Sequence, residues 1–451
     1  MTIVAEADDD LRQVHLTLDL CLRVGELLLS NGAGAADVTA TMRLLADHFG
    51  LRRAEVDVTF TSLSMSYQRE AGDPPAVIMR QVKLREIDYE DLTRVDHLVR
   101  DVVQGRVSLL DARAQMARIV SSGHHRKRWA VTLGWGVMCA AVSFFLGGGP
   151  AVAAIALVTA CCIDRMQLAM SRRRLPFFYQ QVAGGALATS FAVASTYLEL
   201  DLDPSLVVTS NVIMLLAGIG FMGGLQDALS GFYVTAGARL TESLLATAGI
   251  IAGVSGGLGI GDLLDAGISR LEPGSAGLET VPVVMAGSAV CAAAFAFSTY
   301  APKRSLLPIA GIGGIATAFS QLVVTAQLGR TWGAGLAAFF IGLVAFAVAG
   351  RFKIPPLVVV VPAIVPMLPG LSIYRGLSLL SSPLPGSTSE GLLALVSAAA
   401  TALALASGVI LGEYVAQPLK REARRLESRL AGPRLVGPLR SKVKRTRRPV
   451  T

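Results

Sequence analysis

Apolar segments of about twenty residues recur along the chain between residues 129 and 415. A helix needs about 20 mostly apolar residues to cross the hydrocarbon core of a bilayer. We therefore expect a mostly α-helical, polytopic membrane protein with about ten transmembrane helices. The predicted spans are 129–146, 151–170, 177–198, 206–224, 241–260, 281–300, 306–328, 333–350, 355–379 and 391–415.

The first 123 residues carry shorter patterns that are typical of a small α+β domain. Apolar residues recur at helical spacing, then alternate with polar residues as in strands, and then return to helical spacing. The turn residues Gly72, Asp73, Pro74 and Pro75 separate the two alternating segments and favour a hairpin. The predicted elements are helices at 11–30, 35–49, 89–104 and 108–121 and strands at 56–67, with an interruption near Ser62, and at 77–84.

The composition agrees with a membrane protein that has charged ends. The chain of 451 residues is 52% hydrophobic and 16% charged, whereas soluble domains have about 25% charged residues. Most charges lie before residue 129 and after Pro418, and the net charge is +8. We divide the chain into a cytosolic domain (1–123), two membrane halves (124–270 and 271–417) and a basic cytosolic tail (418–451).

The basic residues alternate across the predicted loops. Lys and Arg are enriched in cytoplasmic loops, and this bias sets the orientation of membrane spans. Every second loop is basic, the loops between them are neutral or acidic overall, and the loop that contains Arg330 is the one exception. Both termini are therefore predicted to be cytoplasmic. The basic tail lacks interleaved aromatic residues, so we expect it to contact anionic lipid rather than nucleic acid.

The fourth and ninth predicted spans are similar to each other. Residues 204–225 align with residues 356–377 without a gap, and seven of the 22 positions are identical. The offset is 152 residues, and the other spans pair at a similar offset. Because five spans is an odd number, the two halves would cross the membrane in opposite directions. Such inverted repeats are typical of secondary transporters, which bind substrate at the repeat interface.

Glycines and prolines interrupt both of these spans. Proline removes a helical hydrogen bond, and irregular backbone at membrane depth persists only against protein or a watery cavity. A broken helix offers N–H groups to a carboxylate and carbonyl groups to an ammonium, which an amino-acid zwitterion needs. Close helix packing is the alternative explanation of the glycines. The candidate substrate-binding residues are Asn211, Gly218, Gly220, Pro366, Pro369, Gly370 and Tyr374.

Ionisable residues within membrane spans are costly and therefore mark candidate functional sites. Asp164, Asp227 and Glu242 lie in or near predicted spans and are the candidates for carrying a coupling proton. A local ion pair or contact with lipid headgroups is the alternative explanation for each. The five cysteines and the lone histidines His48 and His97 form no metal-binding or catalytic motif, so we expect neither an enzyme nor a cofactor.

Several segments resemble the threonine/serine exporter family, and the resemblance covers almost the whole chain. Two of them are LLLSNGAGAADVTATMRLLADHFGL (27–51) and GLQDALSGFYVTAGARLTES (224–243). The most specific one is RFKIPPLVVVVPAIVPMLPGLSIYRGL (351–377). The resemblance implies export of L-threonine and L-serine, driven by the proton motive force, across a bacterial plasma membrane. It implies an amino acid, protons and membrane lipid as partners, and it is compatible with a homo-oligomer.

The sequence leaves other functions open. A dicarboxylate exporter would need fixed cations in its cavity, for which Arg165 and Arg375 are the candidates. A membrane-anchored enzyme or sensor would act through the N-terminal domain, although ten spans exceed what an anchor needs. A passive channel would share the architecture of a transporter but would not couple substrate to protons.

Overall fold

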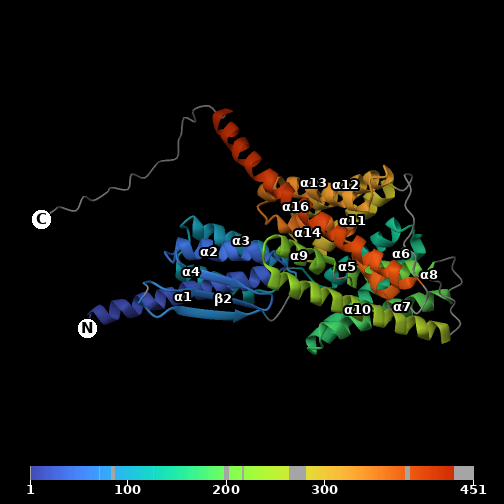
Figure 1. Ribbon diagram of the computed structural model, residues 1–451, viewed down its shortest axis with the longest axis horizontal. Coiled ribbons are helices and arrows are strands. Elements are labelled where there is room, and N and C mark those ends of the chain that lie inside the picture. The colour runs from blue at the N-terminus through green and yellow to red at the C-terminus, as the bar shows by residue number, and fades with distance from the viewer. Residues whose placement is uncertain are drawn as a thin grey trace.

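The computed structural model is mostly helical and has one small sheet near the N-terminus. In Figure 1 the N-terminal domain, drawn in blue, lies at one end of the bundle of long helices. The predicted boundary between the two membrane halves, at residue 270, lies outside the described residues. The structure describes residues 2–70, 72–82, 87–124, 126–197, 203–215, 218–263, 281–380 and 386–430.

The N-terminal domain packs four helices with an antiparallel sheet of strand order β1-β2-β3. The sequence predicted a strand over residues 56–67 with an interruption near Ser62, and the structure has two strands there, because the chain turns between them. The turn is closed by the Thr59 N–H, which donates to Ser62 O at 2.9 Å. The elements are α1 (Thr2–Ser30), α2 (Ala35–His48), β1 (Glu55–Val58), β2 (Ser62–Tyr67), β3 (Ala76–Gln81), α3 (Tyr89–Val103) and α4 (Leu109–Ser121).

The predicted end of the first helix and the predicted start of the fourth are confirmed, whereas α1 begins at Thr2 and not at residue 11. Gly32 ends α1 with a φ of 87°, a conformation that costs glycine little, and the Ala33 N–H donates to Leu28 O at 3.0 Å. Ser108 caps α4 by accepting from the Asp111 N–H. The loop from α1 to α2 is therefore short and held by its own hydrogen bonds.

The membrane region consists of long helices and two bent helix pairs. Seven helices are long and apolar enough to span a bilayer, and each bent pair adds one span, giving up to nine among the described residues. The elements are α5 (Arg128–Phe145), α6 (Pro150–Arg172), α7 (Phe177–Thr196), α8 (Pro204–Leu215), α9 (Gly218–Leu229), α10 (Tyr233–Leu263), α11 (Val281–Ser298), η2 (Lys303–Ser305), α12 (Leu306–Thr325), α13 (Arg330–Phe352), α14 (Leu357–Ile364), η3 (Val365–Met367), α15 (Gly370–Leu380) and α16 (Ser387–Leu430).

The structure therefore gives seven to nine candidate spans where the sequence predicted ten. The predicted span that is missing from this count is the third, 177–198, which corresponds to α7, a helix of 20 residues. It is not among the candidate spans, because Gln180 and Gln181 lower the hydropathy of its first turns. The predicted start of the basic tail at residue 418 falls inside α16, which continues to Leu430.

The helices of the two halves follow the same register. Corresponding helices begin 152 to 156 residues apart, close to the offset of the sequence repeat. The packing repeats as well: α5 contacts α6 as α11 contacts α12, and α7 contacts α10 as α13 contacts α16. The halves also meet through equivalent helices, since α5 packs on α11, α9 on α16 and α10 on α15.

Glycines bring the most extensively packed helices, α13 and α16, into backbone contact. A Cβ placed on Gly342 would lie 2.5 Å from Val409 O and 3.2 Å from the Cα of Gly412. Small residues at such crossings let helices approach closely in a membrane. The corresponding pair, α7 and α10, is packed in the same way through Gly253, which faces Val182 O.

We expect Gly342→Leu to destabilise the protein, because its side chain would meet the α16 backbone, which cannot move aside. Overpacking of this kind costs about 1–3 kcal/mol or more. The thermal midpoint of the purified protein in detergent should fall. Gly311→Leu on α12 is the matched control, because a Cβ there meets nothing within 4 Å. Equal midpoints for the two variants would contradict the packing.

Candidate functional site

Both interrupted spans are bent at corresponding positions. The axes of α8 and α9 differ by 42°, and the axes of α14 with η3 and of α15 differ by 47°. The second segments begin at Gly218 and Gly370, which are 152 residues apart. The predicted break in the ninth span is thus confirmed. In the fourth span, where Leu216 and Ala217 lie outside the described residues, the two described segments are bent as well.

Each break lies against the opposite half of the chain. A Cβ placed on Gly218 would lie 3.1 Å from the Cβ of Leu368, which sits inside the second break. Tyr374 on α15 is 5% exposed and belongs to a hydrophobic cluster with Val208 and Val212 of α8. The structure therefore brings Gly218 and Tyr374, together with Pro369 and Gly370 beside Leu368, to one contact between the halves.

Proline chemistry leaves backbone groups without helical partners at this contact. Pro366 lies in η3 and cannot donate to the carbonyl of Pro362. Leu368 is extended, with φ −60° and ψ 136°, so the helical ladder stops there. The first N–H groups of α9 and α15 likewise have no acceptor within their own helices. The breaks therefore present donors for an anionic group and acceptors for a cationic one.

The amide oxygen of Asn211 on α8 is buried and has no hydrogen-bond donor among the described residues. Its side chain is fully buried, and its Nδ2 donates to Val207 O at 2.8 Å. Among the described residues, its Oδ1 accepts no hydrogen bond. A buried polar atom without a partner costs about 1–3 kcal/mol, so this oxygen is suited to accept a ligand hydroxyl or ammonium.

Gly220 lies outside this contact and faces α10 instead. A Cβ placed on Gly220 would lie 2.6 Å from Ser243 Oγ, and one placed on Gly223 would lie 2.8 Å from Arg239 Nη1. The α9 glycines therefore admit a buried polar stripe of α10. This stripe was not predicted from the sequence, although polar residues that recur every four positions lie on one face of a helix. Its members are Thr235, Arg239, Ser243 and Thr247.

Asp227 lies where α9 meets the N-terminal domain. It is 1% exposed, and its Oδ2 lies 3.2 Å from Arg239 Nε. Its Oδ1 accepts from the Ala35 N–H at 2.8 Å, and Arg239 Nη2 donates to Ala33 O at 2.8 Å. Asp227 thus replaces the side-chain cap that α2 lacks, since its N-cap residue is Gly34.

The other candidate acids are placed separately. Asp164 on α6 pairs with Arg128 at 2.7 Å and accepts from Thr132 Oγ1 at 2.7 Å, which joins α6 to α5. Glu242 is half-buried on α10, beside Ser243. Neither is placed by a described contact at the junction of the two breaks. The cationic candidates of the sequence analysis, Arg165 and Arg375, are exposed.

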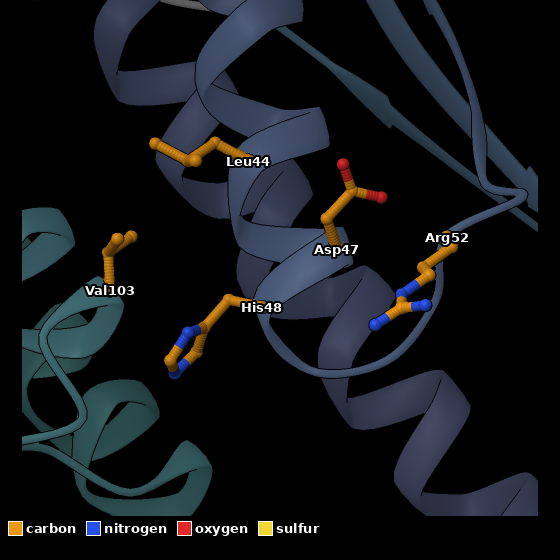
Figure 2. A pocket seen from close by; sticks show the side chains of 5 residues that line it. All are labelled: Leu44, Asp47, His48, Arg52 and Val103. Carbon is orange, nitrogen blue, oxygen red and sulfur yellow. The ribbon is translucent and has the colours of Figure 1, made fainter.

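The N-terminal domain has a surface groove of about 450 Å³ between α2 and α3 (Figure 2). Figure 2 shows His48 and Val103 on facing sides of it. The groove lies at the end of α2 that is opposite Asp227, about 20 Å away along the helix axis. It is therefore remote from the helix breaks. Its lining is Leu44, Asp47, His48, Arg52 and Val103.

The architecture and the paired breaks define the class of the protein. It is a multi-pass membrane protein in which two broken helices from two similar halves meet at a buried contact. Broken helices at a repeat interface are the arrangement in which secondary transporters bind substrate. The fold therefore indicates a membrane transport protein.

Comparison with known proteins identifies the family. Residues 19–261 match a family described as "Putative threonine/serine exporter", and residues 284–415 match "Threonine/Serine exporter, ThrE". A "Probable threonine/serine exporter" of Mycobacterium tuberculosis is 35% identical over 94% of this chain and 81% of its own length. A "Threonine/serine exporter" of Corynebacterium glutamicum is 34% identical, over 92% and 85% respectively. The chain belongs to the threonine/serine exporter family. No solved structure matches it.

We expect Gly218→Leu to reduce transport strongly while the protein still reaches the membrane. The new side chain would have to displace Leu368 and thereby shift the second break. Transport by cells that express the variant should be compared with its amount in the membrane fraction. Gly259→Leu on α10 is the control, since a Cβ there has no neighbour within 4 Å. Normal transport by Gly218→Leu would show that the contact between the breaks is dispensable.

Proposed function

We propose that this protein exports L-threonine and L-serine from the cytoplasm by proton antiport, through a site between its two broken helices. The observation that carries the proposal is the contact of Gly218 with Leu368, which joins the two breaks. The printed names of both relatives, threonine/serine exporters, support the substrate. The common register of the two halves supports a repeat. If each half crosses the membrane five times, the second half is inverted relative to the first.

The chemistry of the site suits a hydroxy amino acid. The free N–H groups at the start of α9 and α15 would bind the α-carboxylate, because helix N-termini favour anions. Carbonyl groups released by the prolines would bind the α-ammonium. Asn211 Oδ1 would accept the side-chain hydroxyl, which satisfies the buried oxygen. We assign Pro366, Pro369, Gly370 and Tyr374 to the walls of this site.

The zwitterion is favoured over a dicarboxylate by the placement of the cations. Arg165 and Arg375 are both exposed and do not line the interior. Arg239 is buried, but its charge is matched by Asp227. A dianion at the breaks would therefore meet no uncompensated cation among the described residues.

The proposed orientation places the N-terminal domain in the cytoplasm of a bacterial cell. Aromatic side chains are enriched where membrane spans meet the lipid headgroups. In this protein, three of them are exposed at helix ends on the side of the basic loops. Trp129, Tyr179 and Tyr233 are 60%, 57% and 74% exposed. Trp129 follows the basic segment that links the N-terminal domain to α5, so this domain belongs on the cytoplasmic side.

Asp227 is the carboxylate that we propose to carry the coupling proton. It lies on the segment that begins at the first break, and protonation would remove the charge that holds Arg239. Protonation of Asp227 would therefore affect both the segment that begins at the break and the contact between α9 and α10. Asp164 is the second candidate, although its pair with Arg128 and its bond from Thr132 also suit a purely structural role. Glu242 is the third.

Cells that express the protein and are loaded with a threonine dipeptide should release threonine faster than control cells. A protonophore should abolish the acceleration, because proton antiport needs the gradient. Release of succinate from loaded cells is the comparison. Faster release of succinate but not of threonine, with the protein in the membrane, would refute the proposed substrate.

Asn211→Leu should lower export of threonine and serine more than export of alanine, because only the first two donate a side-chain hydroxyl. A lost hydrogen bond of this kind costs about 1 kcal/mol, or a factor of about five in transport efficiency. Asn211→Gln, which keeps an amide oxygen, is the comparison variant. Equal losses for all three amino acids would remove Asn211 from the hydroxyl site.

Pro369→Ala and Asp227→Asn should both impair export without preventing membrane insertion. The first restores a helical donor within the second break, and the second removes the charge paired with Arg239. Glu390→Gln is the control, since Glu390 is exposed in the first turn of α16. Wild-type threonine efflux by both variants would refute the assignment of these residues.

A further inference from the structure

The N-terminal domain is attached to the membrane region near the end of α11. The Tyr89 N–H at the start of α3 donates to Thr299 O at 2.9 Å. The ring of His124 stacks on Tyr300 with a centroid distance of 4.0 Å, and Arg126 donates to Ala301 O at 2.8 Å. We call these contacts the α11 attachment. They lie beside the segment that continues into α5, which packs on α11.

A second attachment joins the same domain to α9 and α10, and we call it the latch. It contains the Asp227–Arg239 pair and its bonds to Ala33 and Ala35. Thr235 Oγ1 also donates to Val58 O at 3.1 Å. The latch therefore holds both the loop before α2 and the end of β1.

The latch is buried and specific, so it is more than a surface contact. The side chains of Arg239 and Asp227 are 8% and 1% exposed, and a charge that loses its partner in such a place is strongly disfavoured. Asp37 in the first turn of α2 lies nearby, and its pKa is raised by burial and by the charge of Asp227. The charges of Asp37 and Asp227 therefore repel each other, and the stabilising contacts at this position are those of Arg239, Ala33 and Ala35.

The two attachments hold different groups of helices. The α11 attachment belongs to the first helices of the halves, α5 and α11. The latch belongs to the segments that follow the breaks, since α9 packs with α10 and α16, and α15 packs with α16 and α10. A rigid domain that is bonded to both groups opposes any movement of one group against the other at this end of the bundle.

We propose that the N-terminal domain is a lid on the cytoplasmic mouth, which stays on the α11 attachment and releases the latch whenever the substrate site opens to the cytoplasm. The inference rests on the proposed export of amino acids. Release falls at the latch because the chain itself joins the domain to α5, and α5 is packed on α11. The structure then represents the state that is closed to the cytoplasm.

The test is to fix each attachment in turn with a short bifunctional maleimide. Thr59→Cys with Thr235→Cys would tie the end of β1 to α10 across the latch. His124→Cys with Tyr300→Cys would tie the domain to the α11 attachment and is the matched control. Each single variant, treated with the same reagent, reports any reaction of the five native cysteines.

Threonine efflux should be lost when the Thr59–Thr235 link forms and retained when the His124–Tyr300 link forms. Unchanged efflux with the first link complete would overturn the proposal, and so would equal inhibition by both links. Absence of threonine efflux before any reagent is added, with wild-type protein in the membrane, would instead refute the proposed function. The two failures are therefore distinguishable.

A second measurement covers the case in which the cysteine pair is inactive. Arg239→Gln should speed hydrogen–deuterium exchange of the amides at residues 33–38 in the purified protein, because the Ala35 N–H loses a well-positioned acceptor. Exchange around Tyr89 should stay as in wild type. Arg304→Gln, at an exposed cation, is the control. Unchanged exchange at residues 33–38 would show that the latch does not hold α2.

Discussion

The cost of an unpaired peptide group in hydrocarbon constrains this whole molecule. Each such group costs several kcal/mol, so the chain crosses the membrane region as helices and departs from them where protein covers the departure. Two departures stand out among the described residues, and they occur in register, at Gly218 and Gly370. Because each break packs against the other half, the unpaired groups are shielded from lipid. The same packing leaves polar backbone groups at membrane depth, where the proposed amino-acid zwitterion would need them.

Close helix packing also buries a second set of polar groups between helices. The α9 glycines leave room for the side chains of α10, so the stripe from Thr235 to Thr247 is buried between helices rather than exposed to lipid. Arg239 is the charged member of this stripe. Its guanidinium lies 3.2 Å from the carboxylate of Asp227 and donates to a carbonyl of the N-terminal domain, which links this domain to the segment behind the first break.

Local chemistry made the second break predictable, whereas tertiary contacts did not follow from sequence. Pro366 and Pro369 each remove a helical hydrogen bond within four residues, so the bend there was predicted correctly. The turn at Thr59 was predicted only as an interruption near Ser62, because the alternation of apolar residues continues across it. Gly220 was predicted to face substrate, but the structure places it against Ser243. The bond from Ala35 to Asp227 joins residues 192 positions apart, and no local pattern reports such a pairing.

The repeat is symmetric in backbone and asymmetric in chemistry. At the offset of 152 residues, Asn211, Asp164 and Asp227 of the first half correspond to Ala363, Ala316 and Leu379 of the second. The prolines have the opposite distribution, since Pro366 and Pro369 correspond to Met214 and Ala217. Similar backbones allow the halves to exchange conformations at little cost, which alternating access needs. Unequal side chains make the two resulting states differ in the charges and hydrogen-bonding groups that they expose. A transporter that moves its substrate in one direction needs both properties. In the proposed function, the second half would supply the proline-containing break and the first half the polar groups that bind substrate and protons.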